Sequence, residues 1–524
     1  MKEKLKKVKI SPVAIILSGV LLVYFIYMCY LNLSLTPSFY CTDMYSDILY
    51  SVRVWETKSI FPDGWVFGNQ LYVIATPVLS ALIYGIIGHP ARAMAIATII
   101  MALGVFASFL WMLRPVFEKI EERLLGLLFF IALVAYCGDA IYTVNGWQLF
   151  FTMCSYYACY IITAFICFGC FLRRHEKPTR PRIVAFVFAV LFSFACGMQS
   201  LRQTAVMVLP MLAVEGIMQL KSLIKQKKIE WQALIVTASM SLSNLLGLLV
   251  ARLLSIAKNE IFSSTELLEK AELPSSVNIS LTNMANLLTD KDHRGLLFLM
   301  AVIITAVSLL QAKRLKDKSP NAWGVLVSLF GISVLGIFIL DVHTKMYVRS
   351  IYYFMLVPLI ALLPIYAYRR WRLGKAITLV LLAMIVIGSY KITILPTSEI
   401  ASKSETNLSY EISDMLLERG YTTVYSGWNQ CEDIAIASGG RITAGFWDSS
   451  KDVFNPVMYL CDPSVYEVES EKCVYYLRSD NRDIALQRAE EQGVTMTLVA
   501  EYPTWGIWFY EASENLMQMN MKQP

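Results

Sequence analysis

The sequence predicts a polytopic α-helical membrane protein that ends in a small soluble α/β domain. Apolar residues make up 56% of the 524 positions, charged residues only 16%, and the mean hydropathy is +0.53. A water-soluble chain of this length could not expose or bury so many apolar side chains. About eleven apolar segments are long enough to cross a bilayer, and after residue 395 the pattern changes to short strand-like and helix-like runs.

Each predicted span approaches the roughly 20 apolar residues that a helix needs to cross the hydrocarbon core. Backbone polar groups must be paired inside that core, so helices are the expected form. The first span follows a basic run, but it is too long for a signal peptide and lacks a small-residue cleavage site, so we interpret it as a retained anchor. The spans are 11–32, 91–113, 124–142, 147–172, 183–198, 204–220, 233–255, 295–311, 322–340, 351–368 and 376–395.

The basic residues decide the placement of one ambiguous segment. Residues 71–88 are apolar but contain Pro77 and Gly85. If this segment does not cross and the N-terminus is cytoplasmic, every basic cluster falls on the cytoplasmic side, where Lys and Arg are favoured. As a crossing segment it would place the last five clusters outside, so we prefer the model without it. The clusters lie at 2–9, 114–123, 173–182, 221–228, 313–318 and 369–375.

This topology predicts two large regions outside the cytoplasm. Residues 1–395 form the transmembrane domain, in which 33–90 is the first outer loop with juxtamembrane helices, and 396–524 form an extracytoplasmic α/β domain. Glycines end the helices that are expected in this domain. The expected helices are 410–418, 432–438 and 483–492, and the expected strands are 422–425, 441–446, 473–477 and a hairpin-like pair, 494–502 with 506–511.

Several functional classes find little support in the sequence. The glycines at 427 and 439–440 do not form a phosphate-binding fingerprint. The four histidines show no metal-ligand spacing, so a zinc hydrolase is not expected. Most cysteines lie in or beside spans, where they behave as small apolar residues. In the tail, Cys431, Cys461 and Cys473 would allow one disulfide, whose pairing the sequence leaves open.

The first outer loop carries the most informative polar residues. Asp43 and Asp47 follow the first span and are four residues apart, so on a helix both carboxylates share a face. Apolar residues at helical spacing in 48–58 predict that helix. A structural alternative stays open, in which Asp43 stabilises the first helical turn and Asp47 is solvated. Acids at a membrane exit also lie where the head group of a lipid-linked substrate would be.

The order of motifs in this loop resembles a known family. Residues 61–65 (FPDGW) are followed by Thr76-Pro77, which opens an apolar run to Gly88, and Arg92 enters the second span. This order resembles the GT-C superfamily of membrane glycosyltransferases, particularly bacterial relatives of protein mannosyltransferases and lipid A aminoarabinose transferases. Those proteins are similar in having an acid after the first span, a short helix, a Pro-bearing turn, a Pro-led interfacial helix and an Arg entering the second span.

Two later segments extend the resemblance, which covers the chain to about residue 395. Residues 197–210 (GMQSLRQTAVMVLP) are similar to the family's glycine-leading turn between two mid-chain spans, with Arg202 where the family usually has Lys. Residues 348–353 (VRSIYY) resemble the family's Arg-Tyr motif entering a late span, although two residues separate Arg349 from Tyr352.

The resemblance implies a glycosyltransferase in the bacterial plasma membrane, with a cytoplasmic N-terminus. It would transfer a sugar from a polyprenyl-phosphate-linked donor to a lipid, glycan or protein acceptor at the outer face. The family usually has an Asp-Glu or Asp-x-Asp pair, and this sequence departs from it with Thr42-Asp43 and Asp47 a turn later. The resemblance implies Asp43 as the general base, with Asp47 as its alternative or partner. The same two acids are candidate ligands for a divalent cation (Mg or Mn). The substrate-binding candidates are Arg202, Arg349, Arg92, His89, Arg53, Trp65 and Tyr352.

Other interpretations stay open. The arginines could instead snorkel to the interface, and the aromatic residues could form an interfacial belt. A transporter or flippase of a lipid-linked or small polar substrate would call for internal repeats and charged or broken spans at the midplane, and the sequence shows no such symmetry. A non-catalytic envelope assembly protein that displays its tail domain is also compatible with the sequence. Membrane lipids are expected partners, and no nucleic acid is.

Overall fold

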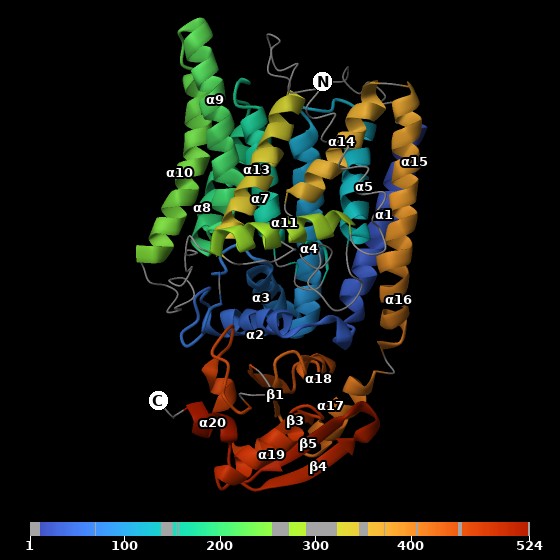
Figure 1. Ribbon diagram of the computed structural model, residues 1–524, viewed down its shortest axis with the longest axis vertical. Coiled ribbons are helices and arrows are strands. Elements are labelled where there is room, and N and C mark those ends of the chain that lie inside the picture. Colours follow the sequence, from blue (N-terminus) through green and yellow to red (C-terminus); the bar gives the residue numbers. More distant parts are fainter. Residues whose placement is uncertain are drawn as a thin grey trace.

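The computed structural model divides into a helical bundle and a smaller sheet domain at one end of it (Figure 1). Helices α2 and α3 lie between them, across the bundle axis (Figure 1). The described residues are 11–68, 70–137, 150–152, 155, 157–253, 272–289, 322–344, 355–370, 372–404, 407–448 and 453–521.

In the described part of the chain, seven helical runs are long and apolar enough to cross a membrane. Large apolar side chains such as Leu22, Ile183, Leu246 and Val380 are exposed on them. Exposed apolar surface of this extent needs lipid around it, so this is an integral membrane protein. The runs are α1 (Pro12–Ser34), α4 (Pro90–Leu113), α8 (Arg180–Gln199), η2 with α9 (Thr204–Val208, Leu209–Gln226), α10 (Trp231–Leu253), α13 (Ala322–Thr344) and α15 with η6 and α16 (Arg372–Ser389, Tyr390–Ile394, Leu395–Ser402).

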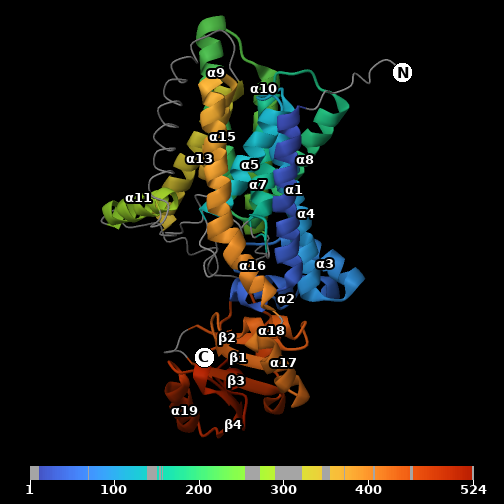
Figure 2. The same cartoon turned by 90° about the vertical axis from the view of Figure 1, so that its right-hand side faces the viewer.

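Shorter helices account for three further predicted spans. They are α5 (Ile120–Tyr136), α7 (Ala158–Leu172) and α14 (Leu356–Arg370). The predicted span 295–311 lies outside the described residues. Another helix, α11 (Leu273–Thr289), lies across the bundle axis and projects from its side (Figure 2).

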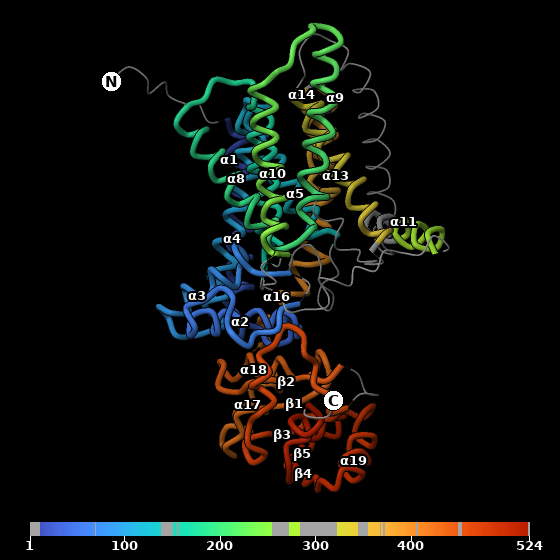
Figure 3. The backbone as a smooth tube through the Cα atoms, turned by 90° about the vertical axis from the view of Figure 1, so that its left-hand side faces the viewer, coloured from blue at the N-terminus to red at the C-terminus, as the bar shows by residue number. Residues whose placement is uncertain are grey.

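The segment 71–88 does not cross the bundle. It contains α3 (Thr76–Ile87), which lies beside α2 (Thr42–Thr57) at the end where α1 finishes and α4 begins (Figure 1). The opposite end of the bundle holds the α9–α10 turn (Figure 3). Hydrogen bonds bring the ends of other helices together as well. Arg173 donates to the Trp111 carbonyl (2.6 Å), and Arg369 donates to the Val116 carbonyl (3.2 Å), so the ends of α7 and α14 lie beside the end of α4. The described basic clusters thus share the end that the charge pattern predicts.

The sheet domain has the predicted α/β pattern. Its strand order is β2-β1-β3-β5-β4, in which β2, β1 and β3 are parallel and β4 and β5 form the antiparallel hairpin. The strands are β1 (Thr423–Gly427), β2 (Thr443–Trp447), β3 (Cys473–Arg478), β4 (Met496–Tyr502) and β5 (Ile507–Ala512). The helices are α17 (Leu408–Glu418), α18 (Glu432–Ala437), α19 (Arg482–Glu491) and α20 (Leu516–Met521), with 3-10 turns η8 (Pro463–Tyr466), η9 (Ser470–Lys472) and η10 (Pro503–Trp505); η1 (Pro37–Phe39) precedes α2.

The two parts share one apolar core. One set of domain side chains, including Trp447, Tyr466 and Tyr475, packs into a cluster of its own. Another set, including Val424 and Phe446, belongs to the cluster that continues into the helical part. The domain is therefore packed against the membrane half, and it is not simply tethered to it.

Candidate active site

The amino-terminal end of α2 is held by the sheet domain. The Thr42 N–H donates to Asn429 Oδ1 (2.9 Å), and the Asn429 N–H donates to Thr42 Oγ1 (2.9 Å). The residue before the helix, Cys41, makes no capping bond with its side chain. Asn429 has a left-handed backbone (φ 59°), which asparagine tolerates. It supplies from the distant tail the cap that a helix usually receives from its own N-cap residue.

Two further contacts fix α2 and the loop after it. The Ala444 N–H donates to the Tyr45 hydroxyl (2.9 Å), and the Tyr45 ring lies edge-on to Phe446. Val66 and Cys461 exchange two backbone hydrogen bonds (2.9 and 3.3 Å). The position of α2 thus depends on residues nearly 400 positions away, as the separation of 399 between Tyr45 and Ala444 shows.

Asp47 is a fully buried acid on α2. The Tyr72 hydroxyl donates to its Oδ1 (2.6 Å), and its Oδ2 has no hydrogen-bond partner among the residues that the structure describes. Burial raises the pKa of Asp47 to about 8, the hydrogen bond from Tyr72 lowers it, and the charge of Asp43 raises it further. Asp47 therefore holds a proton at neutral pH.

Asp43 lies one turn earlier on the same face of α2 and is only half-buried. Burial raises its pKa above the ordinary value. Because it is more exposed than Asp47, Asp43 is the acid of the pair that ionises first as the pH rises. The two carboxyl groups therefore differ in burial and in the order in which they lose their protons.

Arg202 lies just before the π-helical segment η2 and is only 7% exposed. Its Nη1 donates to Gln70 Oε1 (3.2 Å), and its guanidinium group lies over the Tyr157 ring at 5.0 Å. No ion pair joins it to a carboxylate among the described residues. A buried guanidinium group is costly without an anion, so its surroundings favour an anionic ligand.

The loop that follows residue 69 links Arg202 to the acids. Gln70 accepts from Arg202 and also from the Tyr160 hydroxyl (3.1 Å), and Tyr72, two residues later, donates to Asp47. Gln199, at the end of α8, fixes this loop. Its side-chain oxygen accepts from the N–H groups of residues 73 and 74 (3.0 and 2.7 Å), and its carbonyl accepts from the N–H of residue 71 (3.1 Å).

Sequence reasoning missed Gln70, Tyr72 and Gln199. Gln70 precedes and Tyr72 begins the apolar segment 71–88, which was interpreted from its hydropathy and from the charge asymmetry around it, without regard to its polar side chains. Their positions in the sequence were the available signal. Gln70 and Tyr72 are polar residues two apart, just before an apolar helix expected at the interface, and Gln199 stands three residues before Arg202.

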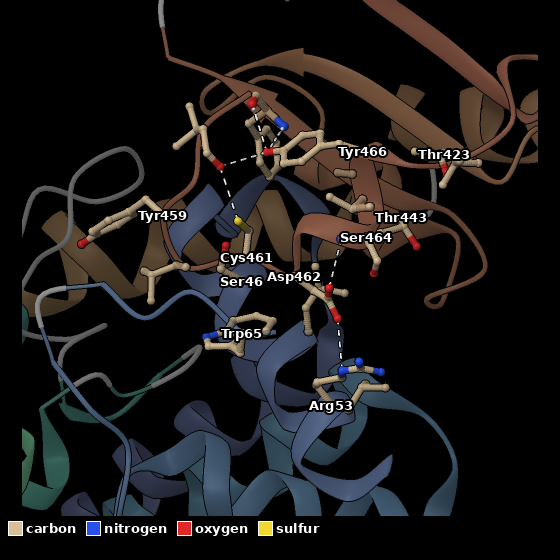
Figure 4. Close-up of a pocket in the computed structure, with 18 of the residues that line it drawn as sticks. Ser46, Arg53, Trp65, Thr423, Thr443, Tyr459, Cys461, Asp462, Ser464 and Tyr466 are labelled. Atoms are coloured by element: carbon tan, nitrogen blue, oxygen red, sulfur yellow. Dashed lines mark hydrogen bonds and ion pairs between the residues drawn. The ribbon is translucent and has the colours of Figure 1, made fainter. Parts of the chain in front are cut away.

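Two predicted binding residues lie elsewhere. Trp65 is buried edge-on against Tyr50, with 5.3 Å between the ring centroids, and its indole N–H has no partner in the described part of the chain. Arg53 pairs with Asp462 of the sheet domain (3.1 Å) and with Glu56 (3.6 Å). Both residues line a cavity of about 300 Å³ between α2 and the sheet domain (Figure 4).

The remaining candidates are not joined to this site by described contacts. His89 caps α4 by accepting the Arg92 N–H at Nδ1 (3.3 Å), and burial together with the Arg92 charge lowers its pKa. The Arg92 side chain is exposed. Arg349 and Tyr352 lie outside the described residues.

The described residues contain no group of three or more His, Cys, Asp or Glu side chains placed to hold a metal ion. Asp43 and Asp47 supply two carboxyl groups on one face of α2, so a Mg²⁺ or Mn²⁺ ion held there would take its other oxygen ligands from water and from a substrate phosphate. In the tail, Cys431, Cys461 and Cys473 are separate thiols with no disulfide between them.

The fold and the placement of this site define a class: a polytopic helical membrane protein with an α/β domain packed over the loop that joins its first two long helices. Two solved structures share that fold. The structure of ArnT from Cupriavidus metallidurans bound to undecaprenyl phosphate has a TM-score of 0.52 and 11% identity, covering 94% of this chain and 98% of that chain. The same protein in the apo state has a TM-score of 0.53 and 12% identity, covering 97% and 99%.

No family model and no curated protein sequence matches this chain. The structural likeness extends over nearly the whole length of both chains, so it includes the sheet domain as well as the bundle. It confirms the GT-C-like fold that the sequence resemblance predicts.

Proposed function

We propose that this protein is a membrane glycosyltransferase that uses a polyprenyl-phosphate-linked sugar as its donor. The observation that carries the proposal is Arg202, a buried cation without a carboxylate partner among the described residues, one loop away from the Asp47–Tyr72 pair. The fold supports it, because the ArnT structure with the same architecture was solved with undecaprenyl phosphate bound.

In this proposal, Arg202 holds the donor phosphate. Only one of its N–H groups is engaged by Gln70, so others remain for phosphate oxygens. Charge-assisted bonds from guanidinium groups are the strongest protein contacts to phosphate. The Tyr157 ring beneath the guanidinium group fixes its plane, which orients those bonds.

Asp43 acts as the general base. It takes the proton from an acceptor hydroxyl as that oxygen forms a bond to the anomeric carbon of the donor sugar. The bond between the anomeric carbon and the phosphate oxygen breaks, and the polyprenyl phosphate leaves with the electron pair. Arg202 stabilises the negative charge that grows on that phosphate. Asp47 stays protonated, so it adds no second negative charge beside the base.

We further propose that the basic end of the bundle faces the cytoplasm of a bacterial cell, so that α2 and the sheet domain face outward. Nucleotide sugars are absent from that side. A donor must therefore arrive through the membrane on a lipid carrier, which agrees with a site placed where α1 ends and α4 begins (Figure 1).

The decisive experiment uses purified full-length protein, a radiolabelled polyprenyl-phosphate sugar and an extract of envelope glycolipids as the acceptor source. Asp43→Asn keeps the shape of the side chain but removes its basicity, so transfer should fall by roughly two to four orders of magnitude while donor binding survives. Asp414→Asn, at an exposed acid on α17, serves as the control.

Full transfer by Asp43→Asn would overturn the catalytic assignment. A flippase would instead carry the intact donor across a proteoliposome membrane without releasing the sugar, and a non-catalytic assembly protein would do neither.

A further inference from the structure

A cavity of about 300 Å³ lies between α2 and the sheet domain (Figure 4). Both halves of the molecule supply its walls, and this volume is at the small end of the range for ligand pockets. Residues from the first outer loop and from the tail line it, among them Ser46, Arg53, Trp65, Thr443, Tyr459 and Asp462 (Figure 4).

We propose that this cavity binds a neutral sugar ring of the acceptor, an inference that rests on the proposed function. Its lining alternates aromatic rings, among them Trp65 and Trp428, with hydroxyl groups, among them Ser46 and Thr443. Sugar rings have apolar faces that pack on aromatic rings and hydroxyl groups that hydrogen-bond.

The charge of the cavity argues against a phosphate group. Among the described residues that line it, the one cation is Arg53, which is already paired with Asp462 and Glu56. These two acids also line the cavity, so its described lining carries one excess negative charge. A phosphate entering this space would be repelled, whereas Arg202 offers elsewhere a cation that no carboxylate of the described residues pairs. The two places therefore suit different ligands: a neutral acceptor sugar here and the donor phosphate at Arg202.

The cavity also lies beside the proposed catalytic groups. Ser46 comes three residues after Asp43 on α2, so the two side chains lie on neighbouring parts of the helix surface. Tyr459 lines the cavity and interacts electrostatically with Arg202. In Figure 4 its hydroxyl group points away from the other labelled residues. An acceptor held here would approach the acids and the donor phosphate from the side of the sheet domain.

Kinetics of cavity variants test the proposal. Ser464 is an exposed residue of the cavity wall, and Ser464→Trp should fill the space without opening the core. The KM for the acceptor should rise by about tenfold or more, the loss expected for a few hydrogen bonds and a stacking contact, while donor affinity stays unchanged. Thr443→Val should raise the acceptor KM less, because it removes one hydroxyl group. Ser479→Trp, an exposed position outside the cavity, is the matched control.

A binding measurement separates this proposal from the proposed function. Saturation-transfer NMR with the methyl glycosides of glucose, galactose and N-acetylglucosamine should show contact with the wild-type protein and with Asp43→Asn, and the contact should disappear in Ser464→Trp. Loss of contact in Ser464→Trp supports the cavity even if the wild type transfers no sugar. Equal NMR contact and equal acceptor KM in Ser464→Trp and Ser479→Trp would overturn it.

Discussion

Replacing Arg202 with methionine tests the proposed donor site most directly, because the substitution removes the charge and keeps the length of the side chain. The surroundings tolerate this loss. Gln70 Oε1 keeps its hydrogen bond from the Tyr160 hydroxyl (3.1 Å) when the bond from Arg202 (3.2 Å) disappears. No buried acceptor is therefore left unpaired, and a buried charge is replaced by an apolar chain, so we expect little loss of thermal stability.

The expected loss of affinity follows from the contacts that Arg202 can make with a phosphate. A hydrogen bond to a charged group contributes about 1.5 to 3 kcal/mol, which corresponds to a Kd roughly 10- to 150-fold weaker. The rate of transfer at saturating donor should fall as well, because the leaving phosphate loses the cation that stabilises its growing charge. Lysine at this position should restore part of the affinity, since it keeps the charge but loses the planar donor geometry.

The assay is equilibrium binding of a radiolabelled polyprenyl-phosphate sugar to purified Arg202→Met, beside a thermal melt of the same sample. Arg441→Met is the matched control, because Arg441 is exposed and its acidic partner Asp414 is 4.0 Å away. An unchanged Kd in a folded Arg202→Met protein would refute the assignment of the phosphate to this side chain.

Three further predictions follow from the same contacts. The pKa of Asp47, about 8 in the folded protein, exceeds the unfolded value of about 3.9, so wild-type stability should fall as the pH rises through that window. The melting temperature of Asp47→Asn relative to wild type should thus climb between about pH 5 and 8, and a constant difference would contradict this. Asn429→Ala removes the side chain that caps α2, a loss of about 1 kcal/mol of stabilisation of that helix end. The kcat should therefore fall about fivefold while the donor Kd stays unchanged, and Asn429→Asp, which keeps the capping oxygen, should restore kcat. Single cysteines introduced beside Arg180 should be protected from membrane-impermeant reagents in intact cells, whereas cysteines introduced beside Asn481 should be labelled. The reverse pattern would invert the topology.

Most of the fold could be predicted because it depends on local chemistry. Charge asymmetry and Pro77 place 71–88 at the interface, and glycine-ended helices between short apolar runs reveal the α/β tail. The span predicted at 147–172 begins too early, because hydropathy carries no information on backbone conformation. Ser155 has a left-handed backbone (φ 38°), so no right-handed helix can run through it, and α7 begins only at Ala158.

The run of helix past residue 395 was also beyond sequence reasoning. A proline at 396 suggests a break, yet α16 continues to Ser402. Pro210 and Pro396 each stand two residues after a π-helical segment, η2 and η6. The wider turn of a π-helix changes which carbonyl groups need an N–H partner, so the proline that follows is accommodated without ending the helix.

The site was only partly predictable for a related reason. Asp43, Asp47 and Arg202 stand out because charged residues are rare near spans. Their partners come from distant segments: Tyr72 lies 25 residues from Asp47, and Gln70 lies 132 from Arg202. Which of two acids is buried, and hence which holds the proton, depends on those partners and not on spacing along α2.

The contacts of α2 bear on whether the tail is a display domain or part of the machinery. If the tail were only displayed, its removal would leave the acids as they are. The structure gives the opposite dependence, since Thr42, directly before Asp43, is capped by Asn429, and the Tyr45 hydroxyl is bonded to β2. Tyr459 brings the tail close to Arg202 as well. The sheet domain thus contacts the helix that carries the acids and also lies near Arg202, which favours the proposal that the tail takes part in catalysis over the alternative of a display domain.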